Sequence, residues 1–139
     1  MDGVLIDANV LLDLFTDDPN WAAWSEERLQ ALMGREPLHI NPIIYAEVSV
    51  GFQRQEELDA ALAAIQPLVL PLCKTSGFLA GKAFLRYRQA GGTRRSPLPD
   101  FYIGAQATVQ GLRLLTRDGT RYKTYFPDVT LIEPESFES

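Results

Sequence analysis

The chain has one cysteine and one histidine among its 139 residues, and it lacks any long hydrophobic run. Because Cys73 has no second cysteine to pair with inside the chain, we expect a reducing, cytoplasmic location. The first fifteen residues carry acids instead of a positively charged segment, which argues against a secretory signal peptide. No apolar stretch approaches the ~20 residues of a membrane-spanning helix, so the sequence predicts no membrane partner.

The sequence also lacks an excess of positive charge. It holds 13 Lys and Arg against 18 Asp and Glu, a formal net charge of −5, whereas nucleic-acid-binding proteins usually carry a basic surface. The charges are unevenly distributed, because residues 1–73 contain 12 acids and 3 bases and residues 74–139 contain 6 acids and 10 bases. The net charge alone therefore does not exclude a nucleic-acid partner.

Short apolar runs alternate with helix-like segments along the whole chain. The predicted strands are residues 4–6, 38–40, 68–72, 113–115 and 129–132, and the predicted helices are residues 10–15, 19–33, 41–53, 56–66, 76–89 and 99–110. This alternation is typical of an α/β sandwich with a mainly parallel central sheet. Folded domains most often have ~100–150 residues, so we expect residues 1–139 to form a single domain.

Three aspartates stand next to predicted strand or helix ends. Asp7 directly follows the strand 4–6, and Asp118 follows the strand 113–115. Ligands of open parallel sheets bind at the carboxyl ends of the strands, which makes both positions candidate site residues. Asp100 begins a helix with a face of small residues. Each aspartate also has an ordinary explanation, a helix cap for Asp7 and Asp100 and a tight turn at Asp118-Gly119.

Glu47 lies on the apolar side of its predicted helix. Its neighbours three or four residues away include Ile43, Ile44 and Val50, whereas the polar residues follow the opposite side. We expect the Glu47 carboxylate to be buried, where it needs a cation, a metal or a proton. The alternative is a position at the helix edge, from which the side chain reaches solvent.

Together these four acids predict one acidic pocket. Carboxylates without His or Cys partners favour Mg²⁺ or Mn²⁺ over zinc. Such a site suits phosphoryl transfer to water, because the metal lowers the pKa of bound water. The four acids would also account for most of the net negative charge.

Four short segments resemble, in order, the motifs of the PIN-domain nucleases. They are Asp7-Ala8-Asn9-Val10-Leu11-Leu12-Asp13, Tyr45-Ala46-Glu47-Val48, Pro99-Asp100-Phe101-Tyr102-Ile103-Gly104-Ala105-Gln106-Ala107 and Leu114-Leu115-Thr116-Arg117-Asp118. The chain is similar in size to the VapC-type toxins of toxin–antitoxin pairs. The resemblance implies a PIN-like α/β/α sandwich and a Mg²⁺- or Mn²⁺-dependent endoribonuclease, commonly homodimeric and inhibited by a small antitoxin protein.

The resemblance also implies roles for individual residues. Asp7, Asp100 and Asp118 would hold the metal, Glu47 would be a further ligand or would orient the attacking water, and Asn9 and Thr116 would support the acids. We expect Asp13 to be a solvated helix residue. The basic residues that could follow an RNA backbone are Arg86, Arg88, Arg94, Arg95 and Arg117, with a solvated surface as the alternative.

Three other functions fit parts of the sequence. The same acids would serve a PIN-type nuclease that cuts other nucleic acid or processes RNA outside a toxin–antitoxin pair. A non-catalytic RNA-binding scaffold is a second alternative, against which the presence of all four acids argues. A phosphoacceptor receiver domain also gathers aspartates at strand ends. It would need a lysine after a late strand, where this chain has Thr116-Arg117-Asp118.

Overall fold

A five-stranded sheet forms the centre of the protein in the computed structural model, which describes residues 2–92 and 98–135. The strands are β1 (Val4–Ile6), β2 (Leu38–Ile40), β3 (Leu68–Val69), β4 (Arg113–Leu115) and β5 (Leu131–Ile132). They lie in the order β3-β2-β1-β4-β5, and all four neighbouring pairs are parallel. The predicted α/β class with a mainly parallel sheet is thereby confirmed.

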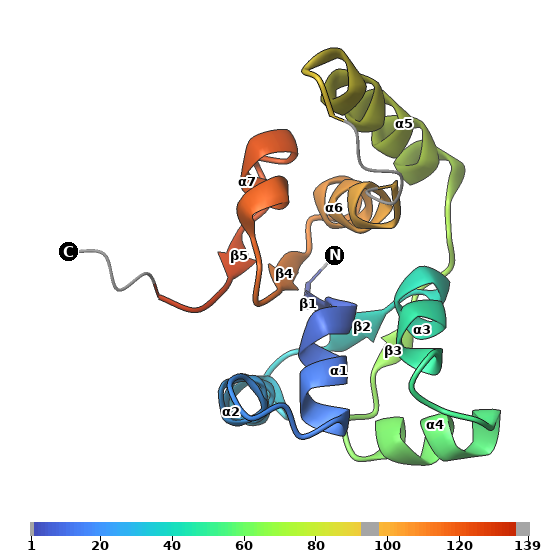
Figure 1. Cartoon of the computed structure of the whole chain (residues 1–139), viewed down its shortest axis with the longest axis vertical. Coiled ribbons are helices and arrows are strands. Elements are labelled where there is room, and N and C mark those ends of the chain that lie inside the picture. The colour runs from blue at the N-terminus through green and yellow to red at the C-terminus, as the bar shows by residue number, and fades with distance from the viewer. Residues whose placement is uncertain (1, 93–97, 136–139) are drawn as a thin grey trace.

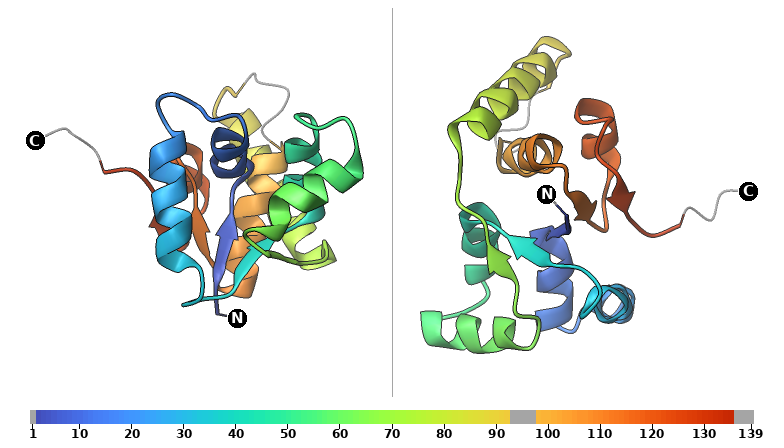
Figure 2. Two further views of the ribbon diagram at one scale, coloured as in Figure 1. Left: turned by 90° about the horizontal axis from the view of Figure 1, so that it is seen from below. Right: turned by 180° about the vertical axis from the view of Figure 1, so that it is seen from behind.

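Helices cover both faces of this sheet. They are α1 (Ala8–Phe15), α2 (Ala22–Leu32), α3 (Pro42–Ser49), α4 (Gln55–Ala63), α5 (Lys74–Gln89), α6 (Leu98–Gln110) and α7 (Thr120–Tyr125). Figure 1 shows α1, α2 and α4 on one side of the strands and α6 and α7 on the other. Helix α5 packs on α6, at the opposite end of the molecule from α4 (Figure 2). The arrangement is an α/β/α sandwich.

The central strand β1 is buried on both faces. Val4, Leu5 and Ile6 have no exposed surface, as expected for a continuous apolar run between two helical layers. On one side of the sheet, α6 approaches the residues after α7 closely because Gly104 has no side chain. A Cβ atom at this position would overlap the ring of Phe126. Gly104 therefore allows α6 and the end of α7 to pack closely against each other.

Helix α7 was absent from the sequence prediction, and other elements differ at their ends. The segment Thr120–Tyr125 has few apolar residues, so hydrophobic periodicity gave no signal for a helix. Two neighbouring parallel strands need a crossover connection, usually a helix, and β4 and β5 are such a pair. Helix α3 ends at Ser49, four residues before the predicted end. None of the helices in residues 2–92 and 98–135 is long and apolar enough to cross a membrane.

Candidate active site

The carboxyl ends of β1 and β4 lie side by side at the point where the chain reverses its direction of travel across the sheet. From β1 the chain proceeds to β2 and β3 on one side, and it later returns to β4 and β5 on the other. Ile6 pairs with Leu115, and the Asp7 amide donates to the Leu115 carbonyl at 2.9 Å. Asp7 and Thr116 consequently meet at a topological switch point, the usual ligand position of open α/β sheets.

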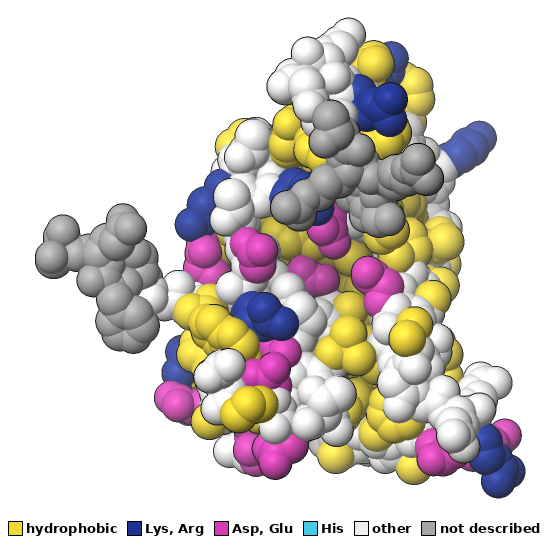
Figure 3. Space-filling view, viewed as in Figure 1, with side chains coloured by type: hydrophobic (Ala, Val, Ile, Leu, Met, Phe, Trp, Pro, Cys, Tyr) yellow, Lys and Arg dark blue, Asp and Glu magenta, His cyan; other side chains and the backbone are white. Residues whose placement is uncertain are grey.

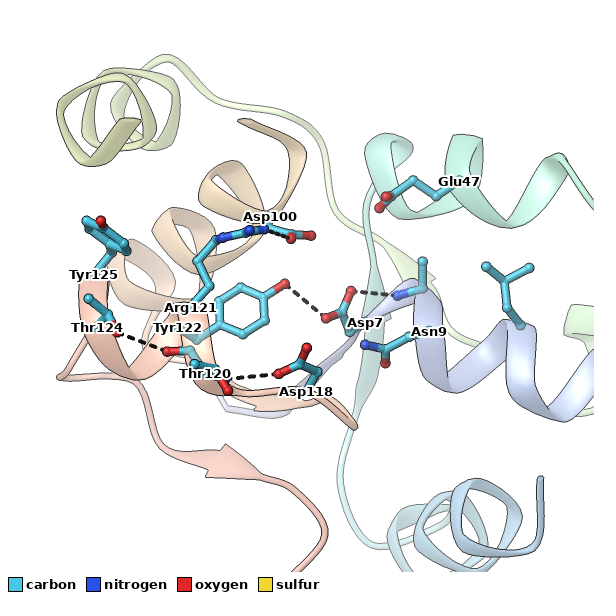
Figure 4. Close-up of a pocket in the computed structure, with 12 residues that line it drawn as sticks. Asp7, Asn9, Glu47, Asp100, Asp118, Thr120, Arg121, Tyr122, Thr124 and Tyr125 are labelled. Carbon is cyan, nitrogen blue, oxygen red and sulfur yellow. Dashed lines mark hydrogen bonds and ion pairs between the residues drawn. The ribbon is translucent and has the colours of Figure 1, made fainter. Parts of the chain in front are cut away.

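A cleft of about 720 Å³ opens at this edge and contains all four predicted acids. Its lining residues are Asp7, Ala8, Asn9, Leu12, Glu47, Asp100, Asp118, Thr120, Arg121, Tyr122, Thr124 and Tyr125. Acidic side chains gather in a hollow near the centre of the face shown in Figure 3. In the close-up, Asp100 and Glu47 point toward one another across the space beside Asp7 (Figure 4). The sheet and three helices thus bring together acids that are up to 111 residues apart in the chain.

Asp7 is the most deeply buried acid of the cleft, with 5% of its surface exposed. Its Oδ1 accepts the amide of Ala8 at 2.8 Å, so it does cap α1, and its Oδ2 accepts the hydroxyls of Thr116 and Tyr122, each at 2.9 Å. Burial, reinforced by the negative charge of Asp100, raises the pKa of Asp7 to about 6 despite these hydrogen bonds. The free energy of ionising Asp7 is therefore high unless a cation enters the cleft.

Asn9 and Thr116 connect the first and fourth motifs. The Asn9 amide donates to Thr116 Oγ1 at 3.2 Å, and the Asp118 backbone amide donates to the same oxygen at 3.2 Å. The Asn9 side-chain oxygen accepts the backbone amide of Arg117 at 3.3 Å. These contacts hold the segment after β4 against the start of α1, and a supporting role of both residues in catalysis stays a prediction.

Glu47 is half-buried on α3 and faces the cleft. Burial and the charges of Asp7 and Asp100 raise its pKa to about 7. Within the described residues, its buried Oε1 has no hydrogen-bond partner. The predicted apolar surroundings are only partly correct, because Ile44 is buried but Val50 is 86% exposed. Val50 is the C-cap residue of α3 and keeps helical backbone angles, so its exposure shows that this end of the helix face is not covered.

Asp100 lies in the first turn of α6 and forms an ion pair with Arg121 of α7. Arg121 Nη1 is 2.7 Å from Asp100 Oδ2. Burial raises the pKa of Asp100, and the Arg121 guanidinium opposes that rise. Arg121 and Tyr122 are cleft residues that the sequence reasoning missed, since α7 itself was not predicted.

Comparison with known proteins assigns the family. The PIN domain family matches residues 4–127, which include all four acids. This chain belongs to the PIN-domain family. Its predicted PIN-like α/β/α sandwich is therefore confirmed. No curated protein matches the chain.

Several solved structures contain a chain with a similar fold. VapBC2 from Rickettsia felis, crystallised with a DNA fragment from its promoter, has a TM-score of 0.73 at 17% identity, covering 96% of this chain and 99% of that chain. FitAcB from Neisseria gonorrhoeae has a TM-score of 0.67 at 21% identity, covering 93% and 96%. A toxin–antitoxin complex from Klebsiella pneumoniae has a TM-score of 0.62 at 23% identity, covering 91% and 95%. At these identities the likeness concerns the fold.

Asp13, predicted to be solvated, is buried in this PIN domain. Only 4% of its surface is exposed, and its two oxygens bind Arg117 at 2.6 Å from Nε and 3.1 Å from Nη2. The Arg117 guanidinium also lies 5.6 Å from the ring centre of Trp21. Arg117 does not line the cleft, so its position gives no support to the predicted contact with RNA. The Arg117 side chain instead holds the segment after β4 against α1 and against Trp21 at the start of α2.

The other predicted basic residues lie outside the cleft lining. Arg86 and Arg88 are exposed in the last turn of α5, where positive charge also suits the helix C-terminus. Arg86 Nη2 donates to the Tyr125 carbonyl at 3.4 Å, and Tyr125 is one of the residues that line the cleft. Arg94 and Arg95 fall outside the described residues. A role of these four arginines in RNA binding stays a prediction.

The acids of this PIN domain fit a hard divalent cation by their chemistry. In the described part of the chain, no three Asp, Glu, His or Cys side chains already converge closely enough to hold a metal ion. Two hydroxyls donate to Asp7, and the Arg121 guanidinium pairs with Asp100. The unpartnered Oε1 of Glu47 and the raised pKa values of three neighbouring acids indicate a site with too little positive charge. Small side-chain rotations would offer oxygen ligands of the kind that Mg²⁺ and Mn²⁺ prefer.

Proposed function

We propose that the chain is a Mg²⁺- or Mn²⁺-dependent endoribonuclease and the toxin of a toxin–antitoxin pair. The observation that carries this proposal is the placement of buried Asp7 at the switch point of the sheet, facing Glu47 and Asp100 in one cleft. Placing two partly buried acids beside the buried Asp7 costs folding free energy, and a bound cation that activates water would offset that cost.

Each acid has a role that follows from its position. Asp7, held by two hydroxyls, and Asp100, on the first turn of α6, would hold the metal. Asp118 is the most exposed of the four and would bind through water. Glu47 lines the cleft, its buried Oε1 has no hydrogen-bond partner among the described residues, and its carboxylate would accept a proton from the attacking water. The bound metal would supply a lowered water pKa and stabilise the leaving oxygen.

The proposal includes a protein partner and a cellular setting. Solved structures of similar fold include a toxin–antitoxin complex from Klebsiella pneumoniae and a member of the VapBC family of toxin–antitoxin systems from Mycobacterium tuberculosis, which supports a small antitoxin as the partner. A homodimer and a cytoplasmic location are parts of the same proposal. The partner gene would lie beside the gene for this chain, and its co-expression would relieve growth arrest caused by this chain alone.

The direct test is cleavage of single-stranded and structured RNA by the purified chain with Mg²⁺, Mn²⁺ or EDTA. We expect cleavage with either metal and none with EDTA. Asp7→Asn and Asp100→Asn should each lower the rate by about 100-fold or more, because the bound metal contributes several kcal/mol to the transition state. Asp128→Asn removes one exposed acid outside the cleft and should leave the rate unchanged.

Other outcomes would point elsewhere. Folded Asp7→Asn protein with full activity, or cleavage that survives chelation, would contradict the metal mechanism. Cutting of DNA without cutting of RNA would support a nuclease of other specificity. RNA binding without cleavage at any metal concentration would support the non-catalytic scaffold.

A further inference from the structure

Arg121 is the one basic residue among those described that line the acidic cleft. Its Nη1 lies 2.7 Å from Asp100 Oδ2, and 24% of its side chain is exposed. A divalent cation bound to Asp100 would compete for the same oxygen and would be repelled by the guanidinium. The ion pair between Arg121 and Asp100 would therefore become less favourable once a metal is bound to Asp100.

Aromatic rings hold the guanidinium independently of Asp100. Its central carbon lies 5.8 Å from the ring centre of Tyr87 and 5.8 Å from that of Phe101. Contacts of this kind stabilise a cation and keep a planar guanidinium in place. Arg121 would consequently stay at the wall of the cleft after Asp100 turned toward a metal.

We propose that Arg121 is a substrate-binding residue, which neutralises Asp100 in the free protein and binds a phosphate of the nucleic acid when a divalent cation replaces it there. The guanidinium carries paired donors that match two phosphate oxygens, and it is already desolvated by its aromatic neighbours. Metal binding would thus release the phosphate-binding group in the same step. This inference rests on the proposed nuclease function.

A purely structural ion pair is the alternative, in which Arg121 only holds α7 to α6. The two roles predict opposite effects on metal affinity. If Arg121 competes with the metal, removing its charge will tighten metal binding. If Arg121 only maintains the fold of the cleft, removing it will misplace Asp100 and weaken metal binding.

The test compares Arg121→Gln and Arg121→Lys with a control, Lys123→Gln. Lys123 lies on the same helix with 62% of its side chain exposed, pairs with Glu133 and does not line the cleft. Calorimetry without RNA measures the affinity for Mn²⁺. Fluorescence anisotropy with a short single-stranded RNA in Ca²⁺, which uses the same oxygen ligands, measures RNA binding. Circular dichroism confirms that each variant is folded.

Arg121→Gln should bind Mn²⁺ about three- to ten-fold more tightly and RNA about ten-fold more weakly than the wild-type chain. Arg121→Lys keeps the charge and should recover part of the RNA affinity, with a raised KM and a smaller change in kcat. Lys123→Gln should change neither affinity beyond about two-fold.

Weaker Mn²⁺ binding by folded Arg121→Gln protein, or RNA affinity equal to that of Lys123→Gln, would overturn the inference. If Arg121→Gln does not fold, the same comparison applies to Arg121→Lys, for which unchanged RNA affinity and KM would overturn it. Failure of the proposed function would look different, because the wild-type chain would then bind Mn²⁺ but cut no RNA.

Discussion

Asp7→Asn should stabilise the metal-free protein at neutral pH, although the same change should abolish cleavage. Asp7 is 5% exposed and lies near the charge of Asp100, so its ionised form is costly in the folded state. In the unfolded chain the same carboxylate is solvated. Replacement by a neutral amide of the same shape removes this cost, which is the reverse of the usual effect of changing a buried, hydrogen-bonded residue.

The size of the effect follows from the pKa. A rise from 3.8 to about 6 corresponds to about 3 kcal/mol of destabilisation when Asp7 is ionised. The side-chain NH₂ of the new asparagine cannot accept the Thr116 hydroxyl, so this hydrogen bond is lost. The NH₂ cannot readily donate to Thr116 Oγ1 instead, because that oxygen already accepts from Asn9 and from the Asp118 backbone amide. That loss costs about 1 kcal/mol. The net stabilisation by Asp7→Asn above pH 7 is therefore about 2 kcal/mol.

The pH dependence has a definite sign. Below about pH 4, Asp7 is protonated in both the folded and the unfolded chain, so its pKa shift contributes nothing. Between about pH 4 and pH 6 the folded chain retains a proton that the unfolded chain has lost, and the free energy of unfolding falls as the pH rises. Above this range both states are ionised and the full cost is present. Asp7→Asn should thus be slightly less stable than wild type near pH 4 and more stable near pH 7.5.

Urea unfolding in EDTA at these two pH values measures the difference directly, with Asp128→Asn as the control for loss of one negative charge. Addition of Mn²⁺ at pH 7.5 should reverse the order, since the metal stabilises wild type in proportion to its occupancy and has little affinity for the variant. A wild-type chain that is more stable than Asp7→Asn at pH 7.5 in EDTA would refute the reasoning about burial and charge.

Two further predictions concern contacts behind the cleft. Asp13→Asn should lower the free energy of unfolding by about 1–2 kcal/mol, because it leaves the half-buried Arg117 without its carboxylate partner. A double-mutant cycle with Arg117→Gln in urea unfolding checks this, and strictly additive losses would show that the pair contributes nothing. Gly104→Ala should cost about 1–3 kcal/mol, because its methyl group overlaps the Phe126 ring. Partial recovery of the thermal unfolding midpoint by an added Phe126→Leu is expected, and an unchanged midpoint in Gly104→Ala alone would contradict the close packing of α6.

The four acids could be found from the sequence because their positions depend on local order. Asp7 and Asp118 follow strands, and the carboxyl ends of parallel strands share one edge whatever the details of packing. Glu47 was recognisable as a carboxylate on the apolar side of a helix. Asn41 and Pro42, which begin that helix as cap and first-turn residue, are likewise local signals. The parallel α/β class and the acidic cleft were therefore predictable from short segments read in order.

The partners of those acids depend on contacts between distant segments. Tyr122 reaches Asp7 across 115 residues, and Arg117 reaches Asp13 across 104 residues. No basic residue stands near Asp13 in the sequence, so no local signal indicated that a distant arginine would pair with it and that the aspartate would be buried. Arg121 lies on a short polar helix without an apolar pattern, and only its packing over α6 brings it to Asp100. The sequence by itself determined that Asp7 and Asp118 meet, because both follow strands of a parallel sheet whose carboxyl ends share one edge. The tertiary structure decided that Glu47 and Asp100 join them and which hydroxyls and cations hold the acids, because α3, α6 and α7 bring those groups in by packing that no local pattern encodes.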